Sequence, residues 1–156
     1  MRSLKLAGTL TAIAAVTHLM IIVGGADWYR FFGAGEQMAQ MQEQGSNYPA
    51  IVTFIIASIL AIWSFYAFSG AKSIRKLPFI KPILSIITLI FLARALFAIP
   101  VVILADSPYM AELANNMSFM VISSMFCLAI GLCYAIGTYQ LLTATKQEKH
   151  KTQGNN

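Results

Sequence analysis

The chain has 156 residues, of which 58% are hydrophobic and only 11% are charged. A soluble domain carries roughly 25% charged residues, so this chain has too little polar surface to cover a water-soluble globule, and lipid is its expected solvent. Its net charge of +5 comes largely from Lys and Arg in short segments between apolar runs, where they act as topology signals. We therefore expect a single membrane domain that binds no nucleic acid.

The first apolar run extends from Leu4 to Gly24 and follows Arg2 and Lys5. It is longer than the apolar stretch of a signal peptide, which has roughly 7–15 residues, and it contains His18. We expect this run to be a transmembrane helix that is retained in the mature protein.

The longest connection covers residues 25–48. Its first part is rich in aromatic residues, which suits a membrane–water interface. The segment from Glu36 to Gln44 lacks Gly and Pro and is rich in helix formers, so it predicts a short helix lying on the membrane surface. Pro49 is well placed to start the next helix.

Three more apolar runs follow: Ala50 to Ala71, Pro82 to Ala105, and Asn116 to Thr143. Each is about 20 residues or longer, enough to cross a hydrocarbon core of about 30 Å as a helix. Polar turns are expected at residues 106–109 and near Glu112. The predicted fold is an all-α membrane bundle of four transmembrane helices within residues 1–143, with a short outer interfacial helix. Residues 144–156 are predicted to be a disordered tail.

The charges outside the apolar runs alternate in sign. From the N-terminus the five segments carry +2, −2, +4, −2 and +2. The positive-inside rule then places both termini and the loop from Lys72 to Lys81 in the cytoplasm.

Arg94 is the most informative single residue, because a charge near the middle of a span costs about 3 kcal/mol on insertion scales. It requires compensation. One hypothesis is that the Arg94 guanidinium binds the carboxylate or phosphate of a ligand. The alternatives are that Arg94 forms an internal ion pair or that its side chain snorkels to the membrane surface. For an internal partner we expect Glu36, since Asp106 would lie about 18 Å further along the same helix.

His18 is the second candidate for a site. It lies 13 residues after Lys5, just as Arg94 lies 13 residues after Lys81, so the two side chains are expected at a similar depth. Small residues on its face favour close helix contact. The alternative to a ligand role is a neutral histidine bonded to a nearby hydroxyl or carbonyl.

Asp27, Trp28 and Glu36 lie in the aromatic segment and form the third candidate, a lid over the outer mouth of the bundle. The structural alternative is an interfacial segment in which Asp27 pairs with Arg30. The stretch from 27 to 36, Asp-Trp-Tyr-Arg-Phe-Phe-Gly-Ala-Gly-Glu, resembles a segment of small uncharacterised bacterial inner-membrane proteins, and the four-run layout fits them over most of the chain. The resemblance implies no activity and no functional residue.

No metal site is predicted, because His18 has no second ligand at suitable spacing and the two cysteines, Cys127 and Cys133, are six residues apart in one helix. We expect no cofactor. No paired acid and base is visible, which favours a protein that is not an enzyme.

The function that the sequence favours is binding of a lipid-like or partner ligand through a polar layer that faces outward, with Arg94 and His18 as anchors. The alternatives are a structural or accessory subunit, a small transporter, and, least favoured, an enzyme that acts on a lipid or quinone. The bilayer is the expected environment, and a membrane-protein partner or a second copy of the chain is a further possible partner.

Overall fold

The computed structural model describes residues 2–104 and 117–153. The described chain is helical and forms these elements: α1 (Arg2–Gly24), α2 (Ala26–Phe31), α3 (Glu36–Glu43), α4 (Tyr48–Gly70), α5 (Ile80–Leu104) and α7 (Met117–Gln153). In these ranges four segments are long and apolar enough to cross a membrane: Arg2–Gly24, Tyr48–Gly70, Ile80–Ala98 and Ser118–Ala144. The predicted all-α membrane bundle of four helices is confirmed.

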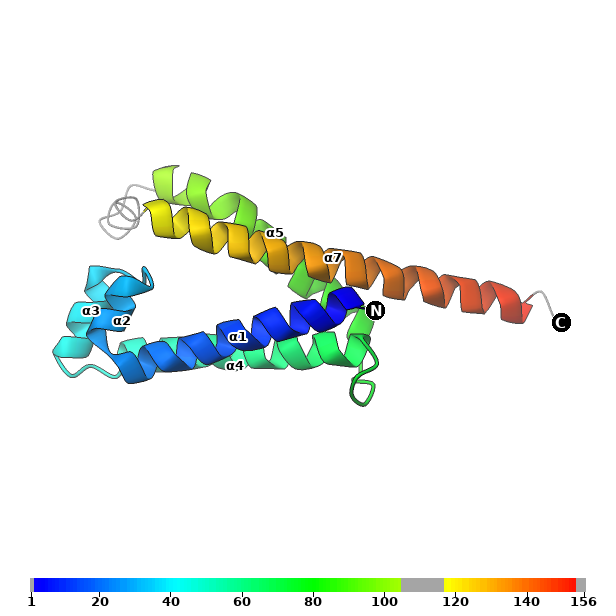
Figure 1. Ribbon diagram of the computed structural model, residues 1–156, viewed down its shortest axis with the longest axis horizontal. Helices are drawn as coiled ribbons and strands as arrows, with labels where there is room; N and C mark the ends of the chain where they lie inside the picture. Colours follow the sequence, from blue (N-terminus) through cyan, green and yellow to red (C-terminus); the bar gives the residue numbers. More distant parts are fainter. Residues whose placement is uncertain (1, 105–116, 154–156) are drawn as a thin grey trace.

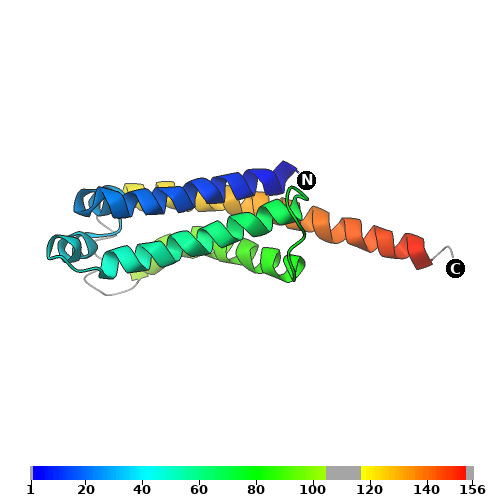
Figure 2. The same cartoon turned by 90° about the horizontal axis from the view of Figure 1, so that it is seen from below.

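The four long helices are arranged as two pairs. α1 packs along α4, and α5 packs along α7. Figure 1 shows that the pairs meet near the N-terminus and diverge toward α2 and α3. Figure 2 gives the perpendicular view, in which α1 overlies α7 and α4 overlies α5. The result is a bundle that is tight at one end and spread at the other.

Small residues allow the pairs to meet at the tight end. Leu4 of α1 is fully buried there and lies against two glycines, Gly70 of α4 and Gly137 of α7. A Cβ on Gly137 would collide with the Leu4 side chain and lie 3.2 Å from its backbone nitrogen. Ser64 of α4 donates a hydrogen bond of 2.8 Å to the Gly8 carbonyl of α1. Close approach through glycine and interhelical hydrogen bonds is typical of membrane helix packing.

An aromatic cluster joins all four long helices further along. The ring of Phe91 on α5 lies 5.5 Å from that of Trp63 on α4 and 5.7 Å from that of Tyr134 on α7. The Tyr134 hydroxyl donates to the Trp63 carbonyl at 3.1 Å and lies 3.3 Å from the Thr11 hydroxyl of α1. We call Thr11, Trp63, Phe91 and Tyr134 the aromatic floor.

Three helices differ from the prediction. α2 (Ala26–Phe31) is a short helix in the segment expected to be a loop, and α3 ends at Glu43, one residue before the predicted end. α7 continues to Gln153 although a disordered tail was predicted from residue 144. That stretch has no Gly or Pro before Gly154 and is rich in helix formers, so the helix has no local reason to end sooner. The predicted turns at 106–109 and near Glu112 lie outside the described residues, as do residues 154–156.

Candidate functional site

The end of the bundle at which the pairs diverge carries a compact cap made of α2 and α3, and the charged contacts of this cap centre on Arg30. The Arg30 guanidinium donates two hydrogen bonds of 2.7 Å to the two carboxylate oxygens of Glu36. A third bond, of 2.8 Å, goes to Glu43, and Asp27 lies 3.5 Å away. A planar guanidinium suits this bidentate geometry. The bonds tie α2 to α3 across the loop that contains two glycines with positive φ, Gly33 and Gly35.

The charges of the cap stabilise one another. The hydrogen bond from Arg30 is the main reason that the pKa of the Glu36 carboxyl lies below its usual value, and Gln40 also bonds this carboxylate. In return, the hydrogen bonds to Glu36 and Glu43 raise the pKa of Arg30. Both groups are therefore charged throughout the physiological range.

The predicted pairing of Arg94 with Glu36 is wrong, because Glu36 is held by Arg30. Among the described residues the ion pairs all converge on Arg30, and Arg94 takes part in none of them. The alternative pairing of Asp27 with Arg30 is present, as the longest of the three contacts.

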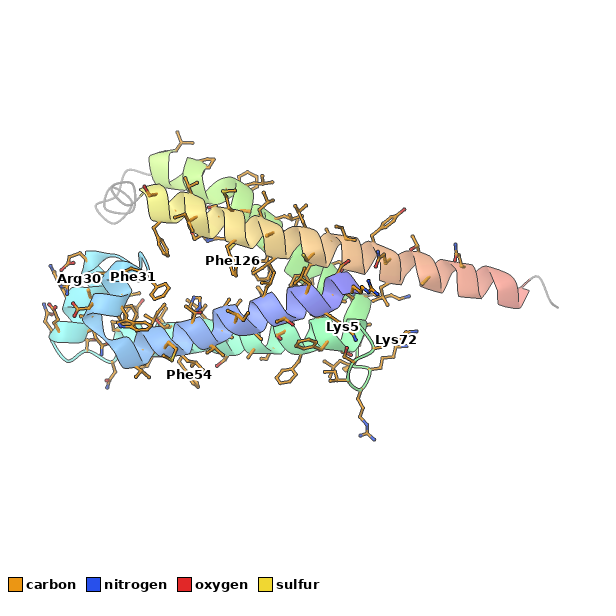
Figure 3. All side chains as sticks on the ribbon, viewed as in Figure 1. Lys5, Arg30, Phe31, Phe54, Lys72 and Phe126 are labelled. Carbon is orange, nitrogen blue, oxygen red and sulfur yellow. The ribbon has the colours of Figure 1, made fainter. Side chains whose placement is uncertain are left out.

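Between the aromatic floor and the cap, the facing sides of the two pairs become accessible. On α7, Ile130 is 1% exposed, but Phe126, one turn nearer the cap on the same side, is 42% exposed. Figure 3 shows Phe126 pointing from α7 toward the α1–α4 pair. We call this region, between the diverging pairs and above the aromatic floor, the wedge.

Arg94 faces the wedge from α5. Ile80, Leu84, Ile87 and Phe91 form a buried stripe on that helix. Arg94 comes seven residues after Ile87, which turns the helix to within about 20° of the same direction. Ile87 is 1% exposed, whereas Arg94 is exposed. Arg94 thus extends the inner face of α5 to the level at which the α1–α4 pair has diverged, and it lies near Cys127 of α7.

His18 faces the wedge from α1. It lies seven residues after Thr11, the residue of the aromatic floor that approaches Tyr134, so it points in nearly the same direction. His18 is half-buried. Its Nδ1 lies 2.7 Å from the Ala14 carbonyl, and because a carbonyl only accepts, Nδ1 carries the hydrogen. This leaves the Nε2 side of the ring for the wedge.

The cap reaches the second helix pair at the mouth of the wedge. A Cβ on Gly33 would collide with the ring of Phe119 on α7, so the loop after α2 lies against the start of that helix. Phe31 of α2 is 76% exposed and lies in the space between the pairs (Figure 3). Aromatic side chains from the cap and from α7 therefore contribute to the same region as Arg94 and His18.

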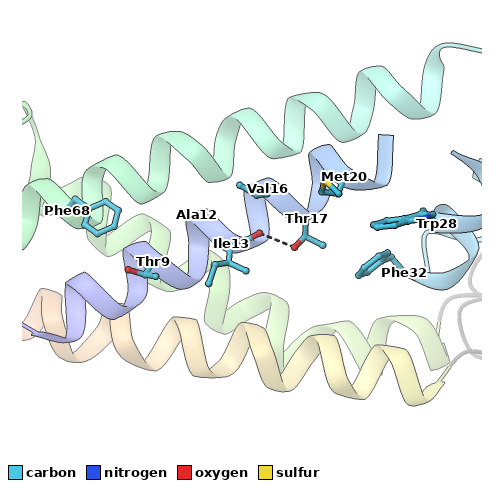
Figure 4. Close-up of a pocket in the computed structure, with 9 residues that line it drawn as sticks. All are labelled: Thr9, Ala12, Ile13, Val16, Thr17, Met20, Trp28, Phe32 and Phe68. Carbon is cyan, nitrogen blue, oxygen red and sulfur yellow. Dashed lines mark hydrogen bonds between the residues drawn. The ribbon is translucent and has the colours of Figure 1, made fainter. Parts of the chain in front are cut away.

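Trp28, the remaining candidate, lies elsewhere. Its ring packs over Gly24 and pairs with Phe32 at a centroid distance of 5.7 Å. Together with Phe68 at the other end, these rings bound an apolar groove of about 440 Å³ along the outer side of α1 (Figure 4). The Thr17 hydroxyl in this groove is already bonded to the Ile13 carbonyl at 2.9 Å, so the groove offers little polar recognition.

The five candidate residues thus lie in three places. Asp27 and Glu36 belong to the ion cluster of the cap, Trp28 lines the outer groove, and Arg94 and His18 face the wedge. Sequence reasoning missed Phe31 and Phe126 as wedge residues. It also missed Arg30 as the partner of Glu36, although three acids lie within 13 residues of that single basic residue. Among the described residues, no group of three potential metal ligands occurs.

No protein-family model matches the chain, no curated protein matches its sequence, and no solved structure matches its fold. The geometry of the wedge and the cap is therefore the basis for any functional conclusion.

Proposed function

We propose that the protein binds an anionic amphiphile, a lipid-like molecule with a carboxylate or phosphate, in the wedge, without catalysing a reaction on it. The observation that carries the proposal is the position of Arg94. It lies on the inner face of α5, is exposed there, and has no carboxylate partner among the described residues. A guanidinium at this depth is costly unless an anion compensates it.

The surroundings of Arg94 suit such a ligand. Phe126 and Phe31 offer apolar surface for a hydrocarbon chain, and a guanidinium recognises the planar oxygens of a carboxylate or phosphate in a bidentate manner. His18 adds a second polar group on the opposite wall. Because the four helices are long and apolar enough to cross a membrane, we expect a ligand to reach the wedge from the bilayer.

The charge distribution supports an orientation for this site. Apart from Arg94 and Arg30, the described basic side chains lie at the tight end of the bundle, with Lys5 and Lys72 marked in Figure 3, while Arg30 and its three acids lie at the cap. By the positive-inside rule we propose that the tight end and both termini are cytoplasmic, in the inner membrane of a bacterium, and that the wedge opens toward the outer leaflet.

Quenching of Trp63 tests the binding. The chain has two tryptophans, so the variant Trp28→Phe leaves Trp63 of the aromatic floor as the only one. Titrating a brominated fatty acid into this protein in detergent should quench its fluorescence. A charged hydrogen bond contributes about 1.5–3 kcal/mol, so Arg94→Gln should weaken the quenching by roughly tenfold or more. Arg94→Lys should weaken it less.

Two controls separate wedge binding from partition into detergent. A brominated alcohol of the same chain length lacks the anion and should give the same curve with the wild-type Arg94 as with the Arg94→Gln variant. Arg75→Gln removes a positive charge far from the wedge and should leave the fatty-acid curve unchanged. Equal fatty-acid curves for the wild-type side chain and Arg94→Gln would refute the proposal.

A second candidate function is that of an accessory subunit. A groove of about 360 Å³ runs between α1 and α4, and small residues, including Ala12, Ala57 and Ala61, form much of its surface. Such a surface suits the close approach of a helix from a partner. A transport role has less support, since the aromatic floor fills the space between the pairs on the side of the termini.

A further inference from the structure

The loop between α4 and α5 has a fixed backbone. α4 ends in a Schellman motif, in which the Lys72 nitrogen bonds the Ser69 carbonyl at 3.0 Å and the Ser73 nitrogen bonds the Phe68 carbonyl at 2.9 Å. The Ser69 side chain then clamps the loop, because its hydroxyl donates to the Arg75 carbonyl at 2.9 Å and accepts from the Leu77 nitrogen at 2.8 Å.

Two side chains in this loop occupy backbone positions that favour glycine. Lys72 has φ 57° and Phe79 has φ 51°, both in the left-handed region, which costs a residue with a Cβ about 1–2 kcal/mol. In the described chain these are the non-glycine residues with positive φ. Backbone strain of this kind is typical of residues that take part in binding.

Phe79 projects from the loop beside a pocket. Its side chain is 78% exposed, and it lies immediately before the span that begins at Ile80. Together with Lys76 and Lys81 it lines a surface pocket of about 510 Å³. A large aromatic flanked by two amines at the end of a span lies where acyl chains give way to headgroups.

The charge around the pocket is of one sign. Lys5, Lys72 and Arg75 lie at the same end of the molecule, and among the described ion pairs none includes a residue of this loop. The ammonium groups of Lys76 and Lys81 are therefore available to donate hydrogen bonds to a ligand from outside the described chain. A negatively charged group with attached hydrocarbon satisfies both the amines and the exposed ring.

We propose that the loop binds the headgroup of an anionic phospholipid, with its phosphate between the Lys76 and Lys81 ammonium groups and its acyl chains against Phe79. The lipid is drawn from the leaflet at the tight end of the bundle. This site is separate from the wedge and does not depend on Arg94.

Lipid retention measured by native mass spectrometry tests the proposal. The full-length protein is extracted from vesicles that contain equal amounts of phosphatidylglycerol and phosphatidylcholine, and the bound lipids are counted. The wild type should retain phosphatidylglycerol. Because a basic residue near an anionic surface contributes about 1 kcal/mol, the double change Lys76→Gln and Lys81→Gln should weaken retention roughly 30-fold. Phe79→Ala should weaken retention of both lipids while leaving the preference for phosphatidylglycerol.

A matched variant separates a pocket from a diffuse charge effect. The double change Lys5→Gln and Arg75→Gln removes the same charge from the same end but leaves the pocket intact, so it should reduce retention much less. Equal losses in the two double variants would overturn the proposal. Thermal midpoints of all variants check that each one folds, and Lys76→Arg with Lys81→Arg should restore retention.

Inorganic phosphate distinguishes a lipid from a soluble anion. An excess of phosphate should not displace the retained phosphatidylglycerol, since it lacks the acyl chains that contact Phe79. Complete displacement by phosphate would overturn the lipid as the ligand. In an Arg94→Gln background, which removes the anchor of the wedge, Lys76→Gln with Lys81→Gln should still cause the same loss of phosphatidylglycerol, so the outcome is independent of the wedge.

Discussion

Arg30 holds Glu36 by two hydrogen bonds of 2.7 Å, one to each carboxylate oxygen. The pair joins two short helices outside the spans, α2 and α3, and Glu43 adds a further bond to the same guanidinium. This contact has a consequence for the membrane interior, because the acid expected to neutralise Arg94 is already engaged. Arg30 and the three acids of the cap therefore pair with one another, whereas Arg94 in the wedge is exposed and has no carboxylate partner among the described residues.

A double-mutant cycle tests this assignment of partners. Arg30→Met and Glu36→Gln should each lower the thermal midpoint, and the double variant should lose less than the sum of the two, because the same contact is removed only once. The cycle of Arg94→Met with Glu36→Gln should be additive, since these residues share no contact. A coupling between Arg94 and Glu36 as large as that between Arg30 and Glu36 would contradict the structure.

The cap should loosen in acid. Arg30 keeps the pKa of Glu36 below its usual value, so the folded pKa is lower than the unfolded one of about 4.3. The stabilisation is then fully present above a pH of about 4.3 and is lost as the pH falls through the lower folded value. The protection factors of α3 amides against hydrogen exchange, which correct for the slower intrinsic exchange in acid, should fall in that window. Glu36→Gln should reduce this pH dependence, and an unchanged pH profile in that variant would argue against the pair.

The sequence predicts the spans well because membrane helices are governed by length and hydropathy, which are local properties. The sequence does not determine the partner of Glu36, because both Arg30 and Arg94 are basic residues that could pair with this carboxylate. Arg30 lies six residues away and outside the four apolar spans, while Arg94 is distant in sequence. The nearer pairing needs only a turn through two glycines, Gly33 and Gly35, and the structure adopts it.

Gly137→Ala should destabilise the bundle. The added methyl group would meet Leu4, which is fully buried and cannot move aside. Overpacking of this kind costs about 1–3 kcal/mol, more than the gain of up to about 1 kcal/mol in helix propensity. Gly131→Ala is the matched control, because its closest contact is the far end of the Leu92 side chain at 2.9 Å, which can rotate. Unfolding in SDS measures both; equal midpoints would contradict the packing at Leu4.

Tyr134→Phe should weaken the aromatic floor. The change keeps the stacking with Phe91 but removes the hydroxyl that bonds the Trp63 carbonyl across the bundle. Interhelical hydrogen bonds in membranes contribute about 0.6–1.7 kcal/mol, so a loss of about 1 kcal/mol in the unfolding free energy is expected. Tyr139→Phe, at a site that is 69% exposed, should have no effect. If the two variants are equally stable, the hydroxyl does not join the pairs.

The orientation can be tested with single cysteines in a background without Cys127 and Cys133. A membrane-impermeant maleimide applied from outside the cell should label a cysteine at Ser46, beside the cap, but not one at Ser73, in the loop after α4. The prediction follows from the alternating charge of the segments between spans. Labelling at Ser73 alone would invert the orientation and place the cap in the cytoplasm.

The site itself was only partly predictable. The shared depth of His18 and Arg94 follows from counting residues along each helix, and the side that each faces follows from helical periodicity. The divergence of the two pairs does not follow from either, because it depends on which glycines meet side chains of other helices, as Gly70 and Gly137 meet Leu4 at the tight end. Wedge residues such as Phe126 are therefore indistinguishable from lipid-facing residues in the sequence.

Photolabelling tests the central claim, that an anionic amphiphile binds at Arg94, most directly. A fatty acid with a diazirine close to its carboxylate is equilibrated with the reconstituted protein, irradiated, and mapped by peptide mass spectrometry. We expect adducts on α5 and α7 around Arg94 and Cys127, and these should disappear in Arg94→Gln while labelling of the outer groove near Trp28 persists. Labelling confined to the outer groove, or adducts near Cys127 that survive Arg94→Gln undiminished, would contradict it.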